Sequence, residues 1–220
     1  MRVIEQNVEI RAPASREQGI EQLRLIEYAG RNCYRSQDKI TADSYKAFNS
    51  HLIERGHHSP LEFAHATFEI VTSRDVMAEL TRHRMASFAI QSQRYVLDDK
   101  DGEINFIKPD FYVPRDESLM DAKGWVASRC WDMAMEDAED RYRYLINTCK
   151  FPAQDARKVL PNSTATVIVM QTNLRELLHI IELRNSPRAY PEMQTMMKLL
   201  IAETRKIYPE ILPKEEEKDD

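Results

Sequence analysis

The sequence has little glycine, and its glycines are isolated from one another. The five are Gly19, Gly30, Gly56, Gly102 and Gly124 in a chain of 220 residues. A P-loop or a dinucleotide-binding fingerprint needs closely spaced glycines, because backbone amides must approach the phosphates. The sequence therefore excludes both motifs. A phosphorylated ligand would have to be held mainly by side chains, and arginine suits that contact best.

Cysteine and histidine are too sparse and scattered for the common disulfide and metal motifs. The three cysteines, Cys33, Cys130 and Cys149, show no C-x-x-C spacing, and the six histidines form no H-E-x-x-H pair. We therefore expect neither a disulfide framework nor a metal site. Cys130 and Cys149 are expected to be small buried apolar residues on helices.

Long apolar runs and an excess of positive charge are also missing. No run approaches the roughly 20 residues of a membrane-spanning helix, and residues 1–13 lack the apolar core of a signal peptide. The 36 acidic and 31 basic side chains give a net charge of −5. That balance argues against a protein that coats nucleic acid. We expect a cytoplasmic protein with neither a membrane nor a nucleic acid as its partner.

The spacing of apolar residues predicts an α+β fold that is mostly helical, with a small mixed or antiparallel sheet. Ser15 with Gln18, and Asn173 with Glu176, resemble capping boxes at helix starts. Strands are expected over 63–72 and 164–170, and a hairpin within 95–112. Helices are expected over 20–33, 42–55, 75–83, 119–149, 152–160, from 174 past 181, and from 193 to Pro209.

The chain shows no internal repeat and no linker between two halves. We therefore expect a single domain over residues 1–220. Its end, from about residue 210, is acidic and is expected to be a frayed, solvated tail.

The chemistry is concentrated between Thr81 and Leu97. This stretch carries Arg82, Arg84 and Arg94 and no acidic residue, although the chain is acidic overall. Acidic neighbours usually neutralise arginines, so their absence indicates an external anion, and guanidinium groups suit phosphate oxygens. The alternative is a basic surface loop, but the apolar residues between the arginines argue against full solvation.

Four segments together form a recognisable pattern. Residues 82–94 have the spacing R-H-R-x-x-S-x-x-x-x-S-x-R, which fixes six positions in thirteen residues, and the other segments are 56–63 (GHHSPLEF), 155–161 (DARKVLP) and 177–184 (LLHIIELR). This pattern resembles the flavin-dependent thymidylate synthase (ThyX) family, and the similarity extends from about Ile20 to Ile207. The resemblance implies a family-like fold of helices with a small mixed sheet.

The resemblance also implies a reaction, the methylation of dUMP to dTMP. The one-carbon unit comes from methylenetetrahydrofolate and the hydride from FAD that NADPH has reduced, with no enzyme nucleophile. Active sites in this family lie between the subunits of a homotetramer. The partners implied are therefore dUMP, folate, NADPH and further copies of the chain.

The family pattern carries over onto named residues. Arg184 is expected to stabilise negative charge on the uracil ring, and Ser92 to belong to the catalytic centre through substrate binding rather than as a nucleophile. Residues expected to hold dUMP are Glu79, Gln91, Ser92, Arg94, Arg157 and Arg184. Residues expected to contact FAD are Cys33, His57, Ser59, Glu62, Arg82, His83, Arg84, Asn173 and His179.

Without the resemblance, several of these residues have ordinary interpretations. His57 would be a loop histidine, His179 a satisfied core residue, and Arg184 a cation that neutralises the end of a helix. The chain also departs from the family pattern at three positions. Ile90 stands where many relatives have Glu or Gln, so Gln91 is expected to take over that contact. Glu79 places a carboxylate near a dianionic substrate, and Arg188 replaces a histidine of some relatives.

Two other functions compete with this interpretation. A histidine phosphatase carries R-H-G-x-R-x-P, but the segment from Arg82 to Arg84 lacks both the glycine and the proline. A non-catalytic nucleotide or RNA binder could use the same arginines. The net charge of −5 and the lack of interleaved exposed aromatic residues argue against it.

Overall fold

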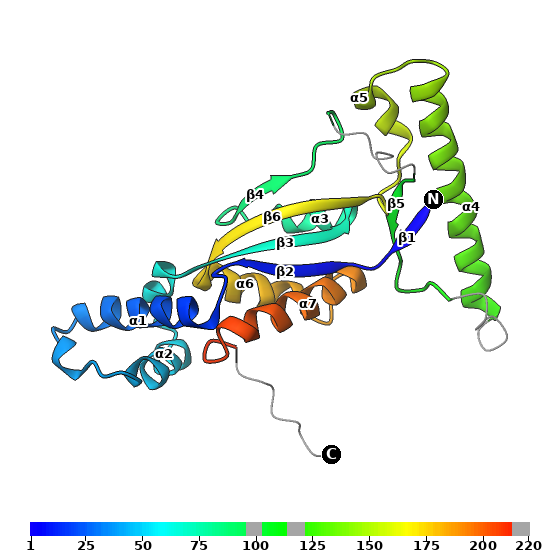
Figure 1. Ribbon diagram of the computed structural model, residues 1–220. Helices are drawn as coiled ribbons and strands as arrows, with labels where there is room; N and C mark the ends of the chain where they lie inside the picture. The colour runs from blue at the N-terminus through cyan, green and yellow to red at the C-terminus, as the bar shows by residue number, and fades with distance from the viewer. Residues whose placement is uncertain (96–102, 114–121, 213–220) are drawn as a thin grey trace. The chain divides into compact units, whose positions relative to one another are not determined.

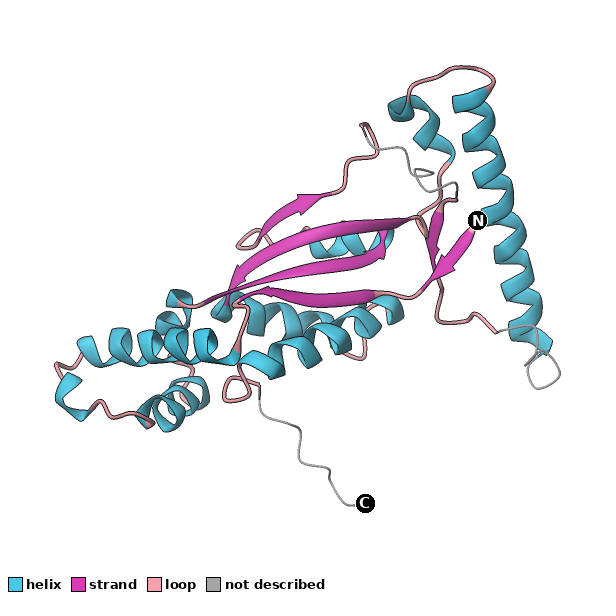
Figure 2. Cartoon of the chain, in the orientation of Figure 1, coloured by secondary structure: helices cyan, strands magenta, loops and turns pink. Residues whose placement is uncertain are grey.

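The computed structural model describes residues 1–95, 103–113 and 122–212 (Figure 1). Helices predominate in these ranges, and two small sheets accompany them (Figure 2). The predicted α+β fold is therefore confirmed. The described residues divide into two compact units, and strands β3 (His65–Ser73) and β6 (Ala165–Asn173) contribute to both. The single domain over 1–220 stays a prediction.

The first unit comprises Met1–Asn7, Val71–Arg82 and Ala89–Ile168. Strand β1 (Arg2–Ile4) pairs in parallel with β5 (Asn105–Ile107). A core cluster that includes Phe106, Trp131 and Tyr142 packs between β5 and the 26-residue helix α4. The helices of this unit are α3 (Arg74–Leu80), α4 (Ala122–Asn147) and α5 (Ala153–Ala156), and the 3-10 turn η4 (Arg157–Val159) follows α5.

The second unit comprises Val8–Ile70, His83–Phe88 and residues from Val169 onward. Helix α1 packs against α2, η2 and α7, and α6 packs against η2 and α7. Its elements are α1 (Arg16–Asn32), η1 (Gln37–Lys39), α2 (Ser44–Glu54), η2 (Ser59–Phe63), α6 (Leu174–Arg184) and α7 (Pro191–Ile207).

A four-stranded sheet has the order β2-β3-β6-β4, with β2 at Asn7–Ala12 and β4 at Ser87–Ile90. Along β3 the side chains of Ala66, Phe68 and Ile70 are fully buried and alternate with more exposed neighbours. This period of two is the one that the sequence predicts for a strand with one buried face.

Local signals explain where the helices begin and end. The Ser15 hydroxyl accepts from the Gln18 amide, and Gln18 in turn accepts from the Ala14 amide, so α1 begins as predicted. Asn173 accepts from the Glu176 amide at 2.9 Å and caps α6. Gly56 follows α2 with a φ of 70°, a left-handed conformation in which glycine avoids the strain of a Cβ atom.

One prediction about structure is wrong, the burial of Cys130 and Cys149. Cys130 and Cys149 are exposed, because Cys130 lies on an outward position of α4 and Cys149 follows the end of that helix. The hairpin expected within 95–112 includes residues 96–102, which lie outside the described ranges, so it stays a prediction; β5 pairs with β1. Residues 210–212 form a turn in which Ile211 is buried, and the acidic tail expected from about residue 210 stays a prediction. Residues 213–220 lie outside the described ranges.

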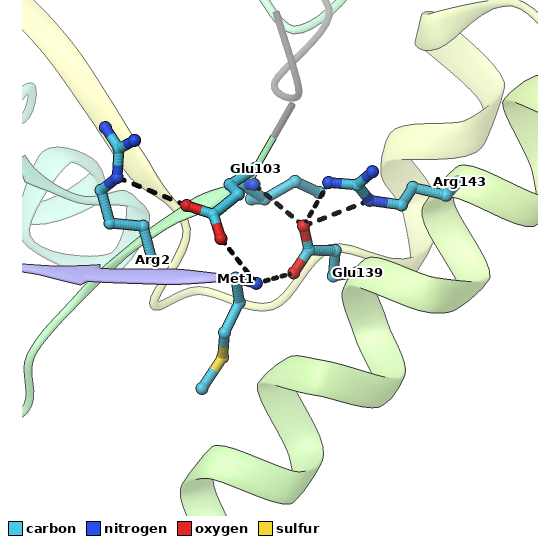
Figure 3. A network of polar contacts seen from close by, with 6 residues as sticks. Met1, Arg2, Glu103, Glu139 and Arg143 are labelled. Carbon is cyan, nitrogen blue, oxygen red and sulfur yellow. Dashed lines mark hydrogen bonds and ion pairs between the residues drawn. The ribbon is translucent and has the colours of Figure 1, made fainter. Parts of the chain in front are cut away.

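A buried carboxylate joins three segments of the first unit (Figure 3). Glu139 on α4 contacts the amino group of Met1 at 2.6 Å and accepts from Arg143 Nη2 at 2.7 Å and from the Ile104 amide at 3.1 Å. Burial raises the pKa of Glu139, but these bonds outweigh it, and the net pKa lies below its ordinary value. The network therefore favours an ionised Glu139.

Candidate functional site

His83 is the buried centre of a polar chain in the second unit. Its side chain is 5% exposed. Arg184 Nε donates to His83 Nε2 at 2.9 Å, and His83 Nδ1 lies 3.4 Å from Glu176 Oε1. The ring of His179 stands edge-on, with its centroid 6.0 Å away. The structure thus brings together three of the predicted site residues, His83, His179 and Arg184, and adds Glu176.

The protonation state of His83 follows from these neighbours. Burial lowers its pKa, the positive charge of Arg184 lowers it further, and the bond and charge of Glu176 oppose them without reversing the shift. His83 is therefore neutral near pH 7. Arginine has no acceptor, so His83 Nε2 must carry the lone pair and Nδ1 the proton.

A cavity of about 410 Å³ opens beside this chain. Helix α6 supplies most of its wall, since residues 175, 179 and 182 recur at helical spacing on one face. Glu62 from η2 closes another side and accepts from Arg175 Nη1 at 2.6 Å. The cavity is lined by His58, Glu62, Met85, Asn173, Arg175, Glu176, Leu178, His179 and Glu182.

A second cavity, of about 560 Å³, lies between α1, α2 and the loop that leads into η2. Three predicted residues, Cys33, His57 and Ser59, line it together with aromatic and basic side chains. The two cavities share His58 and Arg175 in their walls, so they adjoin. The basic side chains around the second cavity are His51, Arg55, His57, His58 and Arg175.

The residues expected to hold dUMP lie in the first unit, apart from Arg184. The backbone fixes the segment after β4, because the Gln91 amide donates to Val167 O at 2.9 Å and Arg74 Nη2 donates to Gln91 O at 3.3 Å. The Ser92 hydroxyl accepts from the Arg94 amide at 3.3 Å, which closes a local turn. Arg94 itself is exposed.

The remaining predicted residues do not line either cavity. Glu79 is half-buried on α3, and its carbonyl accepts from the Arg82 amide at 3.3 Å. Arg157 begins η4 and donates from Nε to Gln154 O at 3.3 Å. Arg82 and Arg84 are exposed and do not line either cavity.

Sequence reasoning missed six of the nine residues that line the cavity of about 410 Å³: His58, Met85, Arg175, Glu176, Leu178 and Glu182. A signal for two of them was present, since Arg175 lies four residues before His179 and Glu182 three residues after it. Such spacing places side chains on one helix face. The described residues contain no group of three or more His, Cys, Asp or Glu side chains that could bind a metal ion.

Comparison with known proteins identifies the class. Residues 18–210 match the family model described as "Thymidylate synthase complementing protein". The flavin-dependent thymidylate synthase of Geobacter sulfurreducens is 35% identical over 193 residues, which cover 84% of this chain and 78% of that protein. These matches place the chain among the flavin-dependent transferases.

Solved structures agree with that class. The flavin-dependent thymidylate synthase of Helicobacter pylori, complexed with FAD and dUMP, is 25% identical with a TM-score of 0.70, covering 90% of this chain and 93% of that one. A UMP/dUMP methylase from Streptomyces cacaoi, 24% identical with a TM-score of 0.75, shares the fold over 96% of this chain and 95% of its own. The chain belongs to the flavin-dependent thymidylate synthase family. The predicted enzyme class and its flavin cofactor are thereby confirmed.

Proposed function

We propose that this chain methylates dUMP to dTMP with methylenetetrahydrofolate as one-carbon donor and NADPH as reductant of bound FAD. One observation carries the proposal: six of the nine residues expected to contact FAD line the two adjoining cavities of the second unit. They are Cys33, His57, Ser59, Glu62, Asn173 and His179.

The side chains of the two cavities fit a flavin dinucleotide. Their volumes, about 560 and 410 Å³, fall within the range of roughly 300–1,000 Å³ usual for small-molecule sites. Arg55, Arg175 and the neighbouring histidines offer donors to a pyrophosphate, which this glycine-poor chain must bind through side chains. Tyr34 and Phe48 offer apolar walls for a planar ring. FAD, when bound, supplies the hydride chemistry.

The protein's own residues have the task of binding dUMP and placing charge. Arg94 and Arg157 are assigned to the phosphate dianion, with Ser92 and Gln91 completing its hydrogen bonds. Arg184 is assigned to the uracil ring, where a fixed cation stabilises negative charge that develops in the transition state. Glu79 is assigned to the dUMP site, whereas Arg82 and Arg84 are assigned to FAD, where guanidinium groups suit the pyrophosphate.

Assembly into a homotetramer with shared active sites belongs to the proposal. Large apolar side chains beside site residues support it: Met85 is 72% exposed, Tyr95 78% and Leu183 50%. Apolar groups exposed around a site are typical of a surface that another subunit covers. The cytoplasmic location rests on the sequence argument. Within the described ranges, no helix has the length and apolar character needed to cross a bilayer.

The proposal is tested first by flavin binding. Purified protein should be yellow with a flavin absorption band, or should recover that band when FAD is added and excess FAD removed. The variant His57→Ala should bind FAD more weakly, whereas Glu69→Gln, on an exposed part of β3, should bind it normally. A colourless protein that does not retain added FAD would contradict the proposal.

A histidine phosphatase is the rival that the sequence left open. Its histidine must present a ring nitrogen to a phosphoryl group, yet both ring nitrogens of His83 face protein partners and its side chain is 5% exposed. Incubation with a chromogenic phosphate ester separates the two functions. Turnover that His83→Ala abolishes would favour the phosphatase.

A further inference from the structure

We propose that Glu176 is a positioning residue that orients Arg184 by acting through His83. The inference deepens the proposed function, because it rests on Arg184 being the cation that stabilises the reacting pyrimidine. The sequence pattern identifies Glu176 only as a helix-capping residue.

The directions of the hydrogen bonds are fixed by chemistry. Arg184 Nε carries a hydrogen and has no acceptor capacity, so its 2.9 Å contact requires the lone pair of His83 Nε2. A neutral ring then carries its proton on Nδ1. That atom lies 3.4 Å from Glu176 Oε1, where a carboxylate accepts it. A carboxylate that holds one ring nitrogen selects the tautomer at the other, as in histidines that orient a metal or a nucleophile.

Helix geometry explains why a relay is needed. Residues 176, 180 and 184 follow one another at i, i+4 and i+8, so Glu176 and Arg184 lie on one face of α6 about 12 Å apart along its axis. Side chains of one helix pair directly at spacings of three or four residues, and these two are eight residues apart. His83 comes from another segment, and its ring bridges the two side chains.

The capping geometry leaves Glu176 available for this role. Asn173 accepts from the Glu176 amide at 2.9 Å, which completes one half of a capping box. The Glu176 carboxylate, however, faces His83, and its side chain is 14% exposed. A carboxylate that only stabilised the helix end would not require a buried imidazole as its partner.

Among the described residues, three charged or titratable groups act on His83, and on balance they leave its ring neutral. Arg184 and His179 disfavour a further positive charge, whereas Glu176 attracts the proton and holds it on Nδ1. Removing Glu176 removes the only one of the three that holds the proton on Nδ1. The His83 proton can then move to Nε2, and the contact with Arg184 Nε must break when it does.

The test compares Glu176→Ala and Glu176→Gln with the wild-type protein, all loaded with FAD. Glu69→Gln is the matched control, because it removes a carboxylate that pairs with Arg11 at 2.8 Å on the sheet surface. The readout is the ring ¹⁵N signals of labelled histidine and the Nε–H signals of labelled arginine. Variants His83→Gln and Arg184→Lys identify the relevant signals by their loss.

In the wild type and in Glu69→Gln, His83 should show one tautomer with the proton on Nδ1, and the Arg184 Nε–H should be protected from exchange. In Glu176→Ala, the ring should become a mixture of tautomers and the Arg184 protection should fall at least tenfold. Glu176→Gln should lie between them, because its amide oxygen still accepts from Nδ1. An unchanged tautomer and unchanged protection in Glu176→Ala would overturn the inference.

Steady-state kinetics connects the relay to the reaction. Glu176→Ala should lower kcat for dTMP formation at least tenfold with KM for dUMP within about twofold, and Glu176→Gln should recover part of kcat. A kcat within twofold of the wild type overturns the role in catalysis. If the wild-type enzyme forms no dTMP, the proposed function fails, and the ring signals still decide whether Glu176 orients His83 and Arg184.

Discussion

At the scale of single residues, the surroundings of the buried His83 imidazole determine its protonation state. Burial and the adjacent Arg184 lower its pKa, so the neutral form prevails when the protein is folded. In the unfolded chain His83 titrates near its ordinary value of 6.5. The unfolded state therefore binds a proton first as the pH falls.

This difference predicts a pH-dependent stability. The contribution of His83 is fully present above about pH 6.5 and is lost as the pH falls toward its lower folded pKa. The free energy of unfolding, measured by urea titration between pH 7.5 and 5, should decline more in the wild type than in His83→Gln. His51→Gln, at an exposed position of α2, should decline as the wild type does. Equal slopes for wild type and His83→Gln would contradict the assignment.

Arg184 gives a second prediction at this scale. Arg184→Ala should lower kcat for dTMP formation by roughly 100-fold or more, since removal of one donor at developing charge typically has that effect. Flavin should stay bound, because Arg184 does not line either cavity. The measurement is product formation alongside the flavin absorption band. Methyl transfer at the wild-type rate would exclude a ring-stabilising role.

The residue types of the site could be predicted from the sequence, but their pairing could not. The R-H-R segment and Arg184 were identified by motif, whereas the contact between His83 and Arg184 depends on how two distant segments fold. Glu176 has the spacing of a capping residue, and only its burial beside His83 reveals another partner. The burial predicted for Cys130 was also wrong, because the exposure of a helical residue depends on which face of the helix it occupies.

At the scale of elements, helix α6 is the main support of the site. It carries Glu176, His179 and Arg184, and its first residue follows the cap at Asn173. Asn173 also lines the cavity of about 410 Å³. The same side chain therefore serves the helix end and the proposed flavin site, and the two roles can be separated by substitution.

Substitutions at Asn173 should separate stability from binding. Asn173→Ala removes the cap and should lower the free energy of unfolding of the FAD-free protein by about 1 kcal/mol. Asn173→Asp keeps a capping oxygen and should retain stability, while its negative charge weakens FAD binding. Thermal unfolding and FAD titration measure the two effects. If Asn173→Asp were as unstable as Asn173→Ala, the cap would not be the source of the stabilisation.

Elements with strong periodicity or caps were predictable, and short edge strands were not. The helices α1, α2, α4, α6 and α7 and the strands β3 and β6 lie where apolar spacing places them. Strands β1, β2 and β4 were missed, although Val8 and Ile10 alternate with charged residues in β2. Strands of three to six residues depend on a partner for their stability, and a single sequence does not show that partner.

At the scale of the whole molecule, long-range polar contacts join segments that the sequence keeps apart. Glu139 is the clearest case, since its carboxylate links α4 to residue 1 and to the backbone of Ile104. The lowered pKa of Glu139 means that its contribution to stability is present above its ordinary value of 4.5 and is lost as the pH falls through the folded pKa.

Glu139→Gln should therefore destabilise the protein near pH 7 by about 2 kcal/mol, because it leaves nearby cations without their buried counter-charge. The difference from the wild type should shrink toward pH 4. Asp137→Asn is the matched control, since it breaks an exposed ion pair with Arg141 on the same helix. Urea unfolding at several pH values decides the point. A loss no larger than that of the control would contradict the account.

The family and its reaction class were accessible from the sequence, whereas the distribution of the site over the fold was not. Most residues expected to hold FAD lie in the second unit, and most residues expected to hold dUMP lie in the first. Motif spacing identifies both sets of residues, but it does not indicate which hydrogen bonds and ion pairs hold their side chains in place. Those contacts, such as Arg74 to Gln91 and Arg175 to Glu62, join residues from separate segments.

The most direct test of the central claim is dTMP formation by the purified protein. The assay contains dUMP, methylenetetrahydrofolate, NADPH and FAD, and product is measured by chromatography after each component is omitted in turn. The account predicts that dTMP forms only when dUMP, methylenetetrahydrofolate and NADPH are present and FAD is bound or added, and that Cys33→Ala still forms it because no cysteine attacks the pyrimidine. Complete loss of dTMP in Cys33→Ala with FAD still bound, or no dTMP from flavin-loaded wild-type protein, would contradict it.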